Sequence, residues 1–465
     1  MTFSTNKPTT KKLAALFTLA SLLTGSVAQA KAPMDLGAVF KAMNKSGNHI
    51  SAEIVNLTTG HELVKVNETA PLNPASTIKL FTAYEALKRL GINYTFKTAV
   101  YVNPDNSVCV KGGGDPSFVM EDMYLLVQML KRKGLESYSG KITLDSSVFD
   151  TEFYPEDRSD QDSERAYNAP IAGLNFNYNT ISVFVNPGKK GGPAIVGLDF
   201  PFSFVKIEGK VTTGSSTDVA WGKKGKGDQE VVTLGGKIAE DADEWRKPFR
   251  IRDPNQAFGE ALSQMLASGK VNATGGVKVV SGVCVGDPYS VYVSKPLSFI
   301  VQLMDKYSNN FIADSLVKML DHEVNKHPGS ETGGLAFIKT ELQKIGIMAD
   351  SKGRAFVSGS GLTLGNKISA SDFITLLKQV HKEKLYLPEL LTSLPIAGVD
   401  GTLKRKYAHT DVADRLRAKT GTLSGVQSLV GIYPTENGDW VAVAIIENGG
   451  RGIPEAEVAR YLGGL

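Results

Sequence analysis

The pattern of apolar and polar positions predicts a mixed α/β chain whose two ends form one domain. Residues 34–45 and 454–461 have helical spacing of apolar positions, one segment near each end of the chain. Strand patterns occupy residues 50–56, 61–66, 418–422, 427–433 and 440–446. Paired in space, these strands would make one antiparallel sheet with helices on its faces.

The residues between these ends have a different character. Strand patterns with two helical segments, 121–133 and 257–266, fill most of residues 93–288. Inside them, residues 185–242 are rich in Gly, Lys, Thr and Val and have almost no helical periodicity, which predicts a small all-β subdomain. Residues 297–391 are mostly helical in pattern and would cap the sheet of the first domain.

The sequence therefore predicts a main domain with two nested inserts. The expected main domain comprises 31–92 and 289–465, the mixed insert domain comprises 93–184 and 243–288, and the inner β subdomain comprises 185–242.

Residues 1–30 have the pattern of a secretion signal. Basic residues Lys7, Lys11 and Lys12 precede an apolar run over 13–27, and Ala28-Gln29-Ala30 is a small-residue cleavage site. The run is too short and too interrupted by Thr and Ser to span a bilayer, and no later segment qualifies. The expected location is outside the cytoplasm, in the periplasm.

The net charge of the mature chain bears on nucleic acids as partners. Removing three lysines with the signal lowers the formal charge from +4 to +1, with 49 basic against 48 acidic residues. This balance gives no indication of nucleic-acid binding.

Two cysteines remain, Cys109 and Cys284, each within a strand-like pattern. In an exported protein they can form a disulfide or stay as two buried thiols, and the spacing alone favours neither.

Ser76-x-x-Lys79 is the first candidate for catalysis. It stands at the start of a helical pattern that is apolar nearly all round and ends at Gly91, which indicates a buried helix. Residues three apart are neighbours on a helix, so the lysine amine can take the serine hydroxyl proton. Roughly two Ser-x-x-Lys matches are expected by chance in a chain of this length, so the motif needs support.

Two further motifs supply that support. Ser308-Asn309-Asn310 lies between two helical segments, and Lys419-Thr420-Gly421 begins a strand. Ser308-Asn309-Asn310 alone could be an ordinary helix cap. A Lys-Thr-Gly triplet is expected only about 0.1 times by chance in a chain of this length. The ordered trio behind a signal peptide matches the motif set of the penicilloyl serine transferases.

Other chemistries lack their motifs. His322 and His327 are five apart, which puts them on different faces of a helix, and no His-Glu-x-x-His occurs. Gly112-Gly113-Gly114 is followed by Asp-Pro, which indicates a turn and not a phosphate loop. No Gly-x-Ser-x-Gly elbow occurs. We therefore expect no metal and no cofactor.

Over essentially the whole mature chain, the sequence resembles the low-molecular-mass class C penicillin-binding proteins, the D-alanyl-D-alanine carboxypeptidase/endopeptidase family. Beyond the trio, the resemblance rests on the segments Gly113-Gly114-Asp115-Pro116, Tyr167-Asn168-Ala169-Pro170, Gly359-Ser360-Gly361-Leu362 and 393–403. It implies a penicillin-binding-protein/β-lactamase-like transpeptidase domain, an antiparallel sheet flanked by helices, with two nested insert domains.

The resemblance also implies roles for the motif residues. Ser76 would be the nucleophile and Lys79 its base, with a pKa depressed by burial and by nearby Lys419. Ser308 and Lys419 would relay a proton to the leaving D-alanine amine, and Asn310 would hold the substrate amide and orient Lys79. The substrate-binding residues would be Thr420, Gly421 and Thr422 of the third motif and, near the substrate side chain, Asp162 and Tyr167. With Lys419, Thr420 would hold the terminal carboxylate, and the N–H groups of Ser76 and Thr422 would bind the oxyanion.

Three positions depart from the family pattern. Relatives that recognise a diaminopimelate side chain have arginine where this chain has Leu364, usually aspartate where it has Ser358, and in some cases glutamine where it has Ser424. Losing the arginine removes a bidentate partner for a carboxylate. We expect altered selectivity for the free end of the peptide stem.

These features predict a serine-type DD-peptidase that acts on peptidoglycan stem peptides through an acyl-serine and is inhibited by β-lactams. Carboxypeptidase and endopeptidase activity are both expected, unranked, and a homo-oligomer is left open. Two alternatives are a non-catalytic penicillin-binding module and a β-lactamase, although the β-lactamase lacks a matching general-base glutamate motif.

Overall fold

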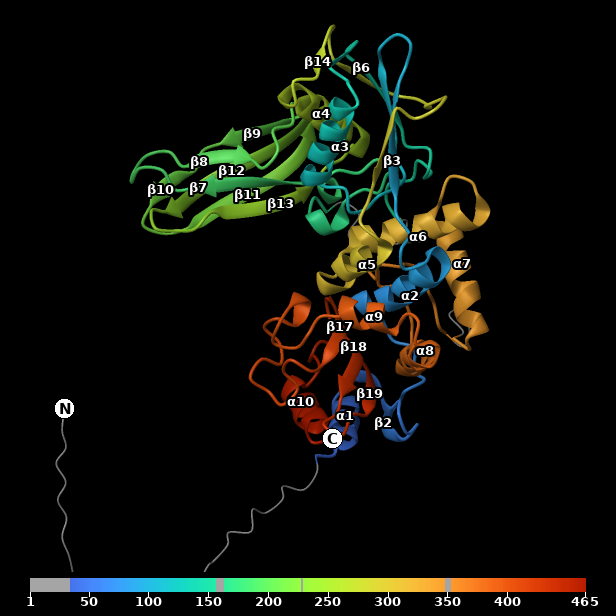
Figure 1. Cartoon of the computed structure of the whole chain (residues 1–465). Coiled ribbons are helices and arrows are strands. Elements are labelled where there is room, and N and C mark those ends of the chain that lie inside the picture. Colours follow the sequence, from blue (N-terminus) through green and yellow to red (C-terminus); the bar gives the residue numbers. More distant parts are fainter. Residues whose placement is uncertain (1–33, 156–162, 227–228, 348–352) are drawn as a thin grey trace, which may run out of the picture.

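The computed structural model describes residues 34–155, 163–226, 229–347 and 353–465. The molecule is elongated, with a sheet at one end, a layer of helices in the middle, and a second sheet and a β subdomain at the other end (Figure 1). The predicted signal segment 1–30 lies outside the described residues, and so does Asp162.

The main sheet combines both ends of the chain, as the apolar pattern predicts. Its strands run antiparallel in the order β17-β18-β19-β1-β2. Their bounds are β17 Arg417–Leu423, β18 Val426–Pro434, β19 Trp440–Asn448, β1 His49–Asn56 and β2 Glu62–Val66. Alternating residues of β1 and β19 enter two different cores, one on each face of the sheet.

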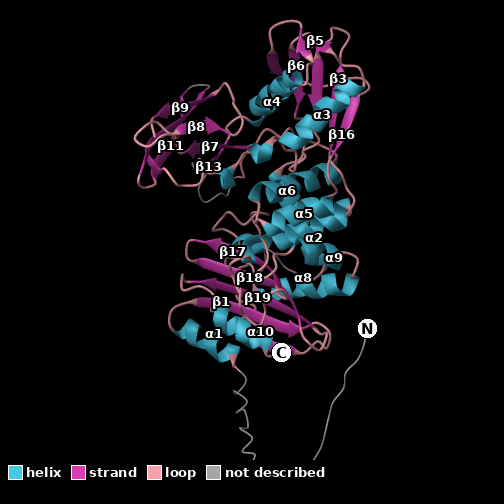
Figure 2. Cartoon of the chain, turned by 60° about the vertical axis from the view of Figure 1, so that its left-hand side comes forward, coloured by secondary structure: helices cyan, strands magenta, loops and turns pink. Residues whose placement is uncertain are grey.

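Helices cover both faces of this sheet (Figure 2). On one face lie α1 (Leu36–Lys45) and α10 (Glu455–Gly463), and on the other lie α2 (Lys79–Leu90) and α8 (Ala370–Glu383). Residues 79–87 of α2 are all buried, which confirms the burial expected from its apolar pattern.

The helical layer corresponds to the pattern predicted over 297–391. It consists of α5 (Leu297–Lys306), α6 (Asn310–Asn325), α7 (Glu331–Lys344) and α9 (Leu387–Ser393). Helices α5 and α6 pack on α2 and on each other through a shared apolar core. Within the described residues no helix combines the length and the apolar character needed to cross a membrane.

A second, outer sheet has the order β15-β6-β4-β3-β16. Its bounds are β3 Lys97–Val102, β4 Val108–Lys111, β6 Lys141–Asp145, β15 Lys278–Ser281 and β16 Ser290–Val293. Helices α3 (Met120–Arg132) and α4 (Pro254–Ser268), close to the two predicted segments, pack on one face of it. A short pair, β5 (Ser137–Tyr138) and β14 (Asn272–Ala273), extends this region.

The inner β subdomain consists of two small sheets, β13-β7-β8 and β10-β12-β11 with β9 on β12. The bounds are β7 Thr180–Asn186, β8 Ile195–Leu198, β9 Val205–Gly209, β10 Thr212–Gly214, β11 Asp218–Lys226, β12 Gln229–Ala239 and β13 Trp245–Arg250. Because β7 pairs with β13, this unit begins near 180 and ends near 250. We propose the division into a main domain and two nested inserts, with the inner one widened to these strands.

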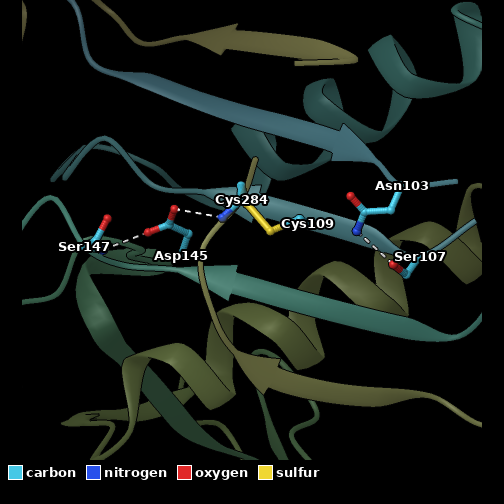
Figure 3. The surroundings of a disulfide bond; sticks show 6 residues. All are labelled: Asn103, Ser107, Cys109, Asp145, Ser147 and Cys284. Atoms are coloured by element: carbon cyan, nitrogen blue, oxygen red, sulfur yellow. Dashed lines mark hydrogen bonds between the residues drawn. A yellow bond between two sulfur atoms is a disulfide. The ribbon is translucent and has the colours of Figure 1, made fainter. Parts of the chain in front are cut away.

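Cys109 and Cys284 form a disulfide, with Cα atoms 5.7 Å apart and 175 residues between them in sequence (Figure 3). The bond ties β4 to the segment after β15. The strand-like pattern expected around Cys284 is only partly right, because β15 ends at Ser281. The Cys284 N–H donates to Asp145 Oδ2 at 3.1 Å, which fixes the segment over the sheet. Closing so long a loop is expected to stabilise the insert by a few kcal/mol, about 2–5.

Candidate active site

Ser76 lies on a 3-10 turn, Ala75–Ile78, that leads directly into α2. The sequence predicts an α-helix here, but Ala75 has a φ of +46°, a left-handed conformation that L-residues rarely adopt. The Pro74 carbonyl accepts hydrogen bonds from Thr77 Oγ1 at 2.7 Å and Ser428 Oγ at 2.6 Å, and these hold the turn. Within the turn, Ser76 is partly exposed, whereas its neighbours Ala75 and Thr77 are buried.

Lys79 is fully buried, and its Nζ contacts three oxygens from three parts of the chain. These are Ser76 Oγ at 3.1 Å, Asn310 Oδ1 at 2.7 Å and the Ser360 carbonyl at 2.5 Å. The predicted approach of Lys79 to Ser76 and to Asn310 is therefore present. The Ser360 carbonyl, inside the Gly359-Ser360-Gly361 segment, is a partner that the sequence reasoning missed.

The second motif spans the break between α5 and α6. Asn309 caps α6 by accepting a hydrogen bond from the Ile312 N–H at 3.1 Å, so the helix-cap interpretation is correct for this residue. Ser308 takes a left-handed φ of +56°, and Asn310 opens the helix. The amide of Asn310 connects Lys79 to the Tyr167 carbonyl, to which its Nδ2 donates at 3.3 Å.

The third motif lies on the edge strand β17 beside the serine turn. Lys419 is fully buried, and its Nζ donates to Ser308 Oγ and to the Thr420 carbonyl, both at 2.8 Å. At Gly421, a Cβ would stand 3.0 Å from the Ser76 nitrogen and 2.6 Å from the Pro74 oxygen. Glycine is therefore required for the strand to approach the turn so closely.

Asp305 is a buried acid in this site that the sequence reasoning missed. It lies on α5, and its Oδ2 accepts a hydrogen bond from Ser393 Oγ at 2.9 Å. No described residue donates to its Oδ1. Burial lowers the pKa of Lys419, and the negative charge of Asp305 opposes that shift. Burial likewise raises the pKa of Asp305, against the charges of Lys419 and Lys79 and the bond from Ser393.

The sequence does carry one signal for Asp305, an acid directly after the apolar helical run 297–304 and three residues before Ser308. The sequence does not show that Asp305 belongs to the site. Tertiary packing of α5 brings it near Lys79 and Lys419, which are more than a hundred positions away.

Three of the residues predicted to recognise the substrate side chain are exposed at the edge of the site, here called the rim. Leu364 is 60% exposed, and Ser424 lies in the exposed turn between β17 and β18. Tyr167 is also partly exposed, and its hydroxyl lies 3.3 Å from Ser163 Oγ. The hydroxyl of Thr420 contacts Thr402 Oγ1 at 2.7 Å, and Thr422 is exposed next to it on β17.

Ser358 is buried and turned away from the rim. Its Oγ accepts from the N–H groups of Ser360 at 3.3 Å and Gly361 at 3.2 Å, so it shapes the loop that offers the Ser360 carbonyl to Lys79.

A cavity of about 270 Å³ opens beside the second motif. Its lining combines three tyrosines with the Ser308 motif; the residues are Ala166, Tyr167, Tyr178, Thr180, Tyr307, Ser308, Asn309, Asn310 and Phe311. Aromatic side chains next to polar groups suit a peptide backbone.

Comparison with protein families decides the assignment. The model of the D-Ala-D-Ala carboxypeptidase 3 (S13) family matches residues 35–461. The chain belongs to this family. The prediction of a serine-type DD-peptidase is thereby confirmed, and the three motifs fall within the matched region.

Individual relatives agree with the family model. The chain is 28% identical over 442 residues to a D-alanyl-D-alanine carboxypeptidase of Actinomadura sp. strain R39, which covers 90% of this chain and 81% of that protein. It is 27% identical over 417 residues to the D-alanyl-D-alanine carboxypeptidase DacB of Haemophilus influenzae, with 87% and 86% covered.

The crystal structure of penicillin-binding protein 4 from Haemophilus influenzae is similar in fold. It has a TM-score of 0.75 and 24% identity, over 92% of this chain and 98% of that one. The expected penicillin-binding-protein fold, with antiparallel sheets and helices, is thus confirmed.

Proposed function

We propose that the chain is exported to the periplasm, where it cleaves D-alanyl bonds of peptidoglycan stem peptides through an acyl-enzyme on Ser76. The observation that carries the proposal is the convergence of two buried lysines on two serines, Lys79 on Ser76 and Lys419 on Ser308. Each lysine comes from a different motif, and the three motifs are far apart in the sequence.

The hydrogen bonds of Lys79 suit a base. A neutral amine has two N–H donors and one lone pair. If the donors go to Asn310 Oδ1 and the Ser360 carbonyl, the lone pair is left for the third neighbour, Ser76 Oγ. The Ser76 hydroxyl then donates its proton to Lys79 as the oxygen attacks the carbonyl of the penultimate D-alanine.

Bond cleavage needs an acid for the leaving group. The ammonium of Lys419 and the hydroxyl of Thr420 bind the terminal carboxylate. When the C–N bond breaks, the amine of the terminal D-alanine takes a proton from the Ser308 hydroxyl, Ser308 takes one from Lys419, and free D-alanine leaves. Water then attacks the acyl-serine and gives a proton through Ser308 to Lys419, while Lys79 returns its proton to Ser76 Oγ and the shortened peptide is released.

Asn310 is placed to serve both enzyme and substrate. Its Oδ1 fixes the Lys79 amine, and its Nδ2, which donates to the Tyr167 carbonyl, faces the tyrosine-lined cavity where the substrate amide would lie. The N–H groups of Ser76 and Thr422 would stabilise the oxyanion.

β-Lactams are expected to acylate the same serine. A structure of the Haemophilus protein is described as a complex with a β-lactam, which supports inhibition by the same class of compound here. The test is labelling with a fluorescent penicillin, which should mark the wild type and leave Ser76→Ala unmarked. Labelling that persists in Ser76→Ala would remove this serine from the mechanism.

Substrate scope is tested with intact sacculi. We expect the wild type to release D-alanine from pentapeptide stems and to convert cross-linked dimeric muropeptides to monomers, because the cavity is open to solvent beside Ser308. A protein that binds penicillin but does neither would be a binding module and not a peptidase.

A further inference from the structure

A second cavity, larger than the one beside Ser308, lies where the outer sheet meets α6. Its volume is about 670 Å³. It is lined by β3, β4, the glycine run after β4 and the second half of α6; the residues are Asn93, Tyr94, Thr95, Lys97, Ala99, Tyr101, Lys111, Gly112, Gly113, Ser147, Val148, Met319, His322 and Glu323. No residue of the three catalytic motifs contributes to it.

The cavity lies on the face of the outer sheet that is opposite α3 and α4. Val100, Val110 and Ile142 point to the helix-covered face and pack in the core with α3 and α4. By strand alternation, Lys97, Ala99 and Tyr101 point to the opposite face. Lys111, paired with Ala99, lies on that same face, and the small side chain of Ala99 leaves a hollow between the two lysines.

This face is basic beside the cavity. Lys97 and Lys111 are exposed, and among the described residues neither has an ion-pair partner. Lys141 and Lys278, paired on β6 and β15, continue the same face away from the cavity. The neighbouring acid Asp145 is buried, and its Oδ2 accepts from the Cys284 N–H beside the disulfide (Figure 3).

The other acid at the cavity is already satisfied. Glu323 accepts hydrogen bonds from Tyr94 Oη at 2.8 Å and from Lys326 Nζ at 2.5 Å. The charge offered to a ligand is therefore that of Lys97 and Lys111, flanked by the ring of Tyr101. Two ammonium groups suit a chain that carries carboxylates.

We propose that this cavity and the basic sheet face bind a second, uncleaved segment of the substrate polymer, through the carboxylates of its stem peptides. The proposal rests on the proposed function for the identity of the polymer. Helix α6 joins the two sites, with Asn310 at its start and Met319 to Glu323 nine to thirteen residues later. At 1.5 Å per residue the separation along the helix is about 15–20 Å, so one polymer can reach both.

Binding to purified sacculi tests the site. In a Ser76→Ala background, which prevents cleavage, Lys97→Glu with Lys111→Glu should weaken binding about tenfold or more at low salt. The matched control is Lys131→Glu with Lys210→Glu, two exposed lysines of the inserts that lie outside the cavity, and it should change binding less than twofold. Equal loss in both variants would reduce the effect to net charge and overturn the site.

The same substitutions in the enzyme with Ser76 separate the two sites. Acylation by penicillin and D-alanine release from a small soluble peptide should stay within twofold of wild type. Loss of either would mean that the cavity belongs to the active site, which contradicts the proposal.

Sacculi whose carboxylates have been amidated identify the ligand. The protein should bind them as weakly as the Lys97→Glu, Lys111→Glu variant binds untreated sacculi. Undiminished binding would exclude stem-peptide carboxylates. If D-alanine release fails in the wild type while lysine-dependent binding remains, the proposed function fails and the binding site stands.

Discussion

The catalytic centre and its rim are held in opposite ways. Lys79 and Lys419 are fully buried, and together they make five hydrogen bonds to oxygens from four parts of the chain. Leu364 and Ser424, expected to face the substrate side chain, are exposed on loops. In the proposed mechanism the reacting groups are held by buried hydrogen bonds, whereas selectivity would depend on exposed side chains that can change without disturbing those bonds.

The largest effect on acylation is expected from removing the amine of Lys79, the proposed base. Lys79→Met keeps the length of the side chain and deletes the amine, so acylation by penicillin should fall about 10³-fold. The measurement is the second-order rate of penicillin acylation, with thermal unfolding to confirm folding.

A matched control is Lys318→Met. Lys318 is also fully buried on a helix, but its Nζ pairs with Asp150 at 2.5 Å, away from the motifs. This variant should lose stability while its folded fraction acylates at nearly the wild-type rate. If both variants lost acylation equally, burial of a charge and not the position of Lys79 would explain the effect.

The next largest effect is expected from removing the negative charge of Asp305. The Asp305 carboxylate raises the pKa of Lys419 against the effect of burial. In Asp305→Asn that opposition is gone, so the pKa of Lys419 falls further and its protonated form is lost at lower pH. The alkaline limb of the acylation profile should therefore move to lower pH, by about one unit.

A second variant separates charge from packing. Ser393→Ala removes the hydrogen bond to Asp305 and keeps the carboxylate, so the alkaline limb should move much less. An unchanged limb in Asp305→Asn would show that Asp305 does not act on Lys419.

The smallest effect is expected at the rim. Leu364→Arg introduces a guanidinium at a position expected to face the substrate side chain, and it should raise the preference for stem peptides with a free side-chain carboxylate about fivefold. The measurement is the ratio of kcat/KM for two peptides that differ only in that carboxylate.

Leu385→Arg controls for the added charge. Leu385 is as exposed as Leu364, but it lies between α8 and α9. Equal preference in the two variants would remove Leu364 from recognition.

Apolar periodicity predicted the elements that bury one face. The five strands of the main sheet and the helices on it follow from alternation and helical spacing in the two chain ends. The 3-10 turn at Ser76 did not follow, because the φ of Ala75 is imposed by contacts from Ser428 and Gly421, over 340 residues away. Likewise, the disulfide depends on how β15 lies beside β6, which spacing does not reveal.

Motif order predicted which side chains meet but not what surrounds them. Lys79 bonds to Ser76 and Asn310, and Lys419 bonds to Ser308, so the side chains named by the resemblance meet in two hydrogen-bonded groups. The sequence assigned no role to Asp305 or to the Ser360 carbonyl, because each acts through tertiary packing. Ser358 was expected to bear on selectivity, but its hydroxyl is occupied by backbone N–H groups of its own loop.

The central claim is that Ser76 carries the acyl group. The direct measurement is mass spectrometry of the protein after incubation with penicillin, followed by peptide mapping. The account predicts a single added penicilloyl mass, located on the peptide that contains Ser76, long-lived in the wild type and missing from Ser76→Ala. An adduct on any other residue, or one that forms equally in Ser76→Ala, would contradict it.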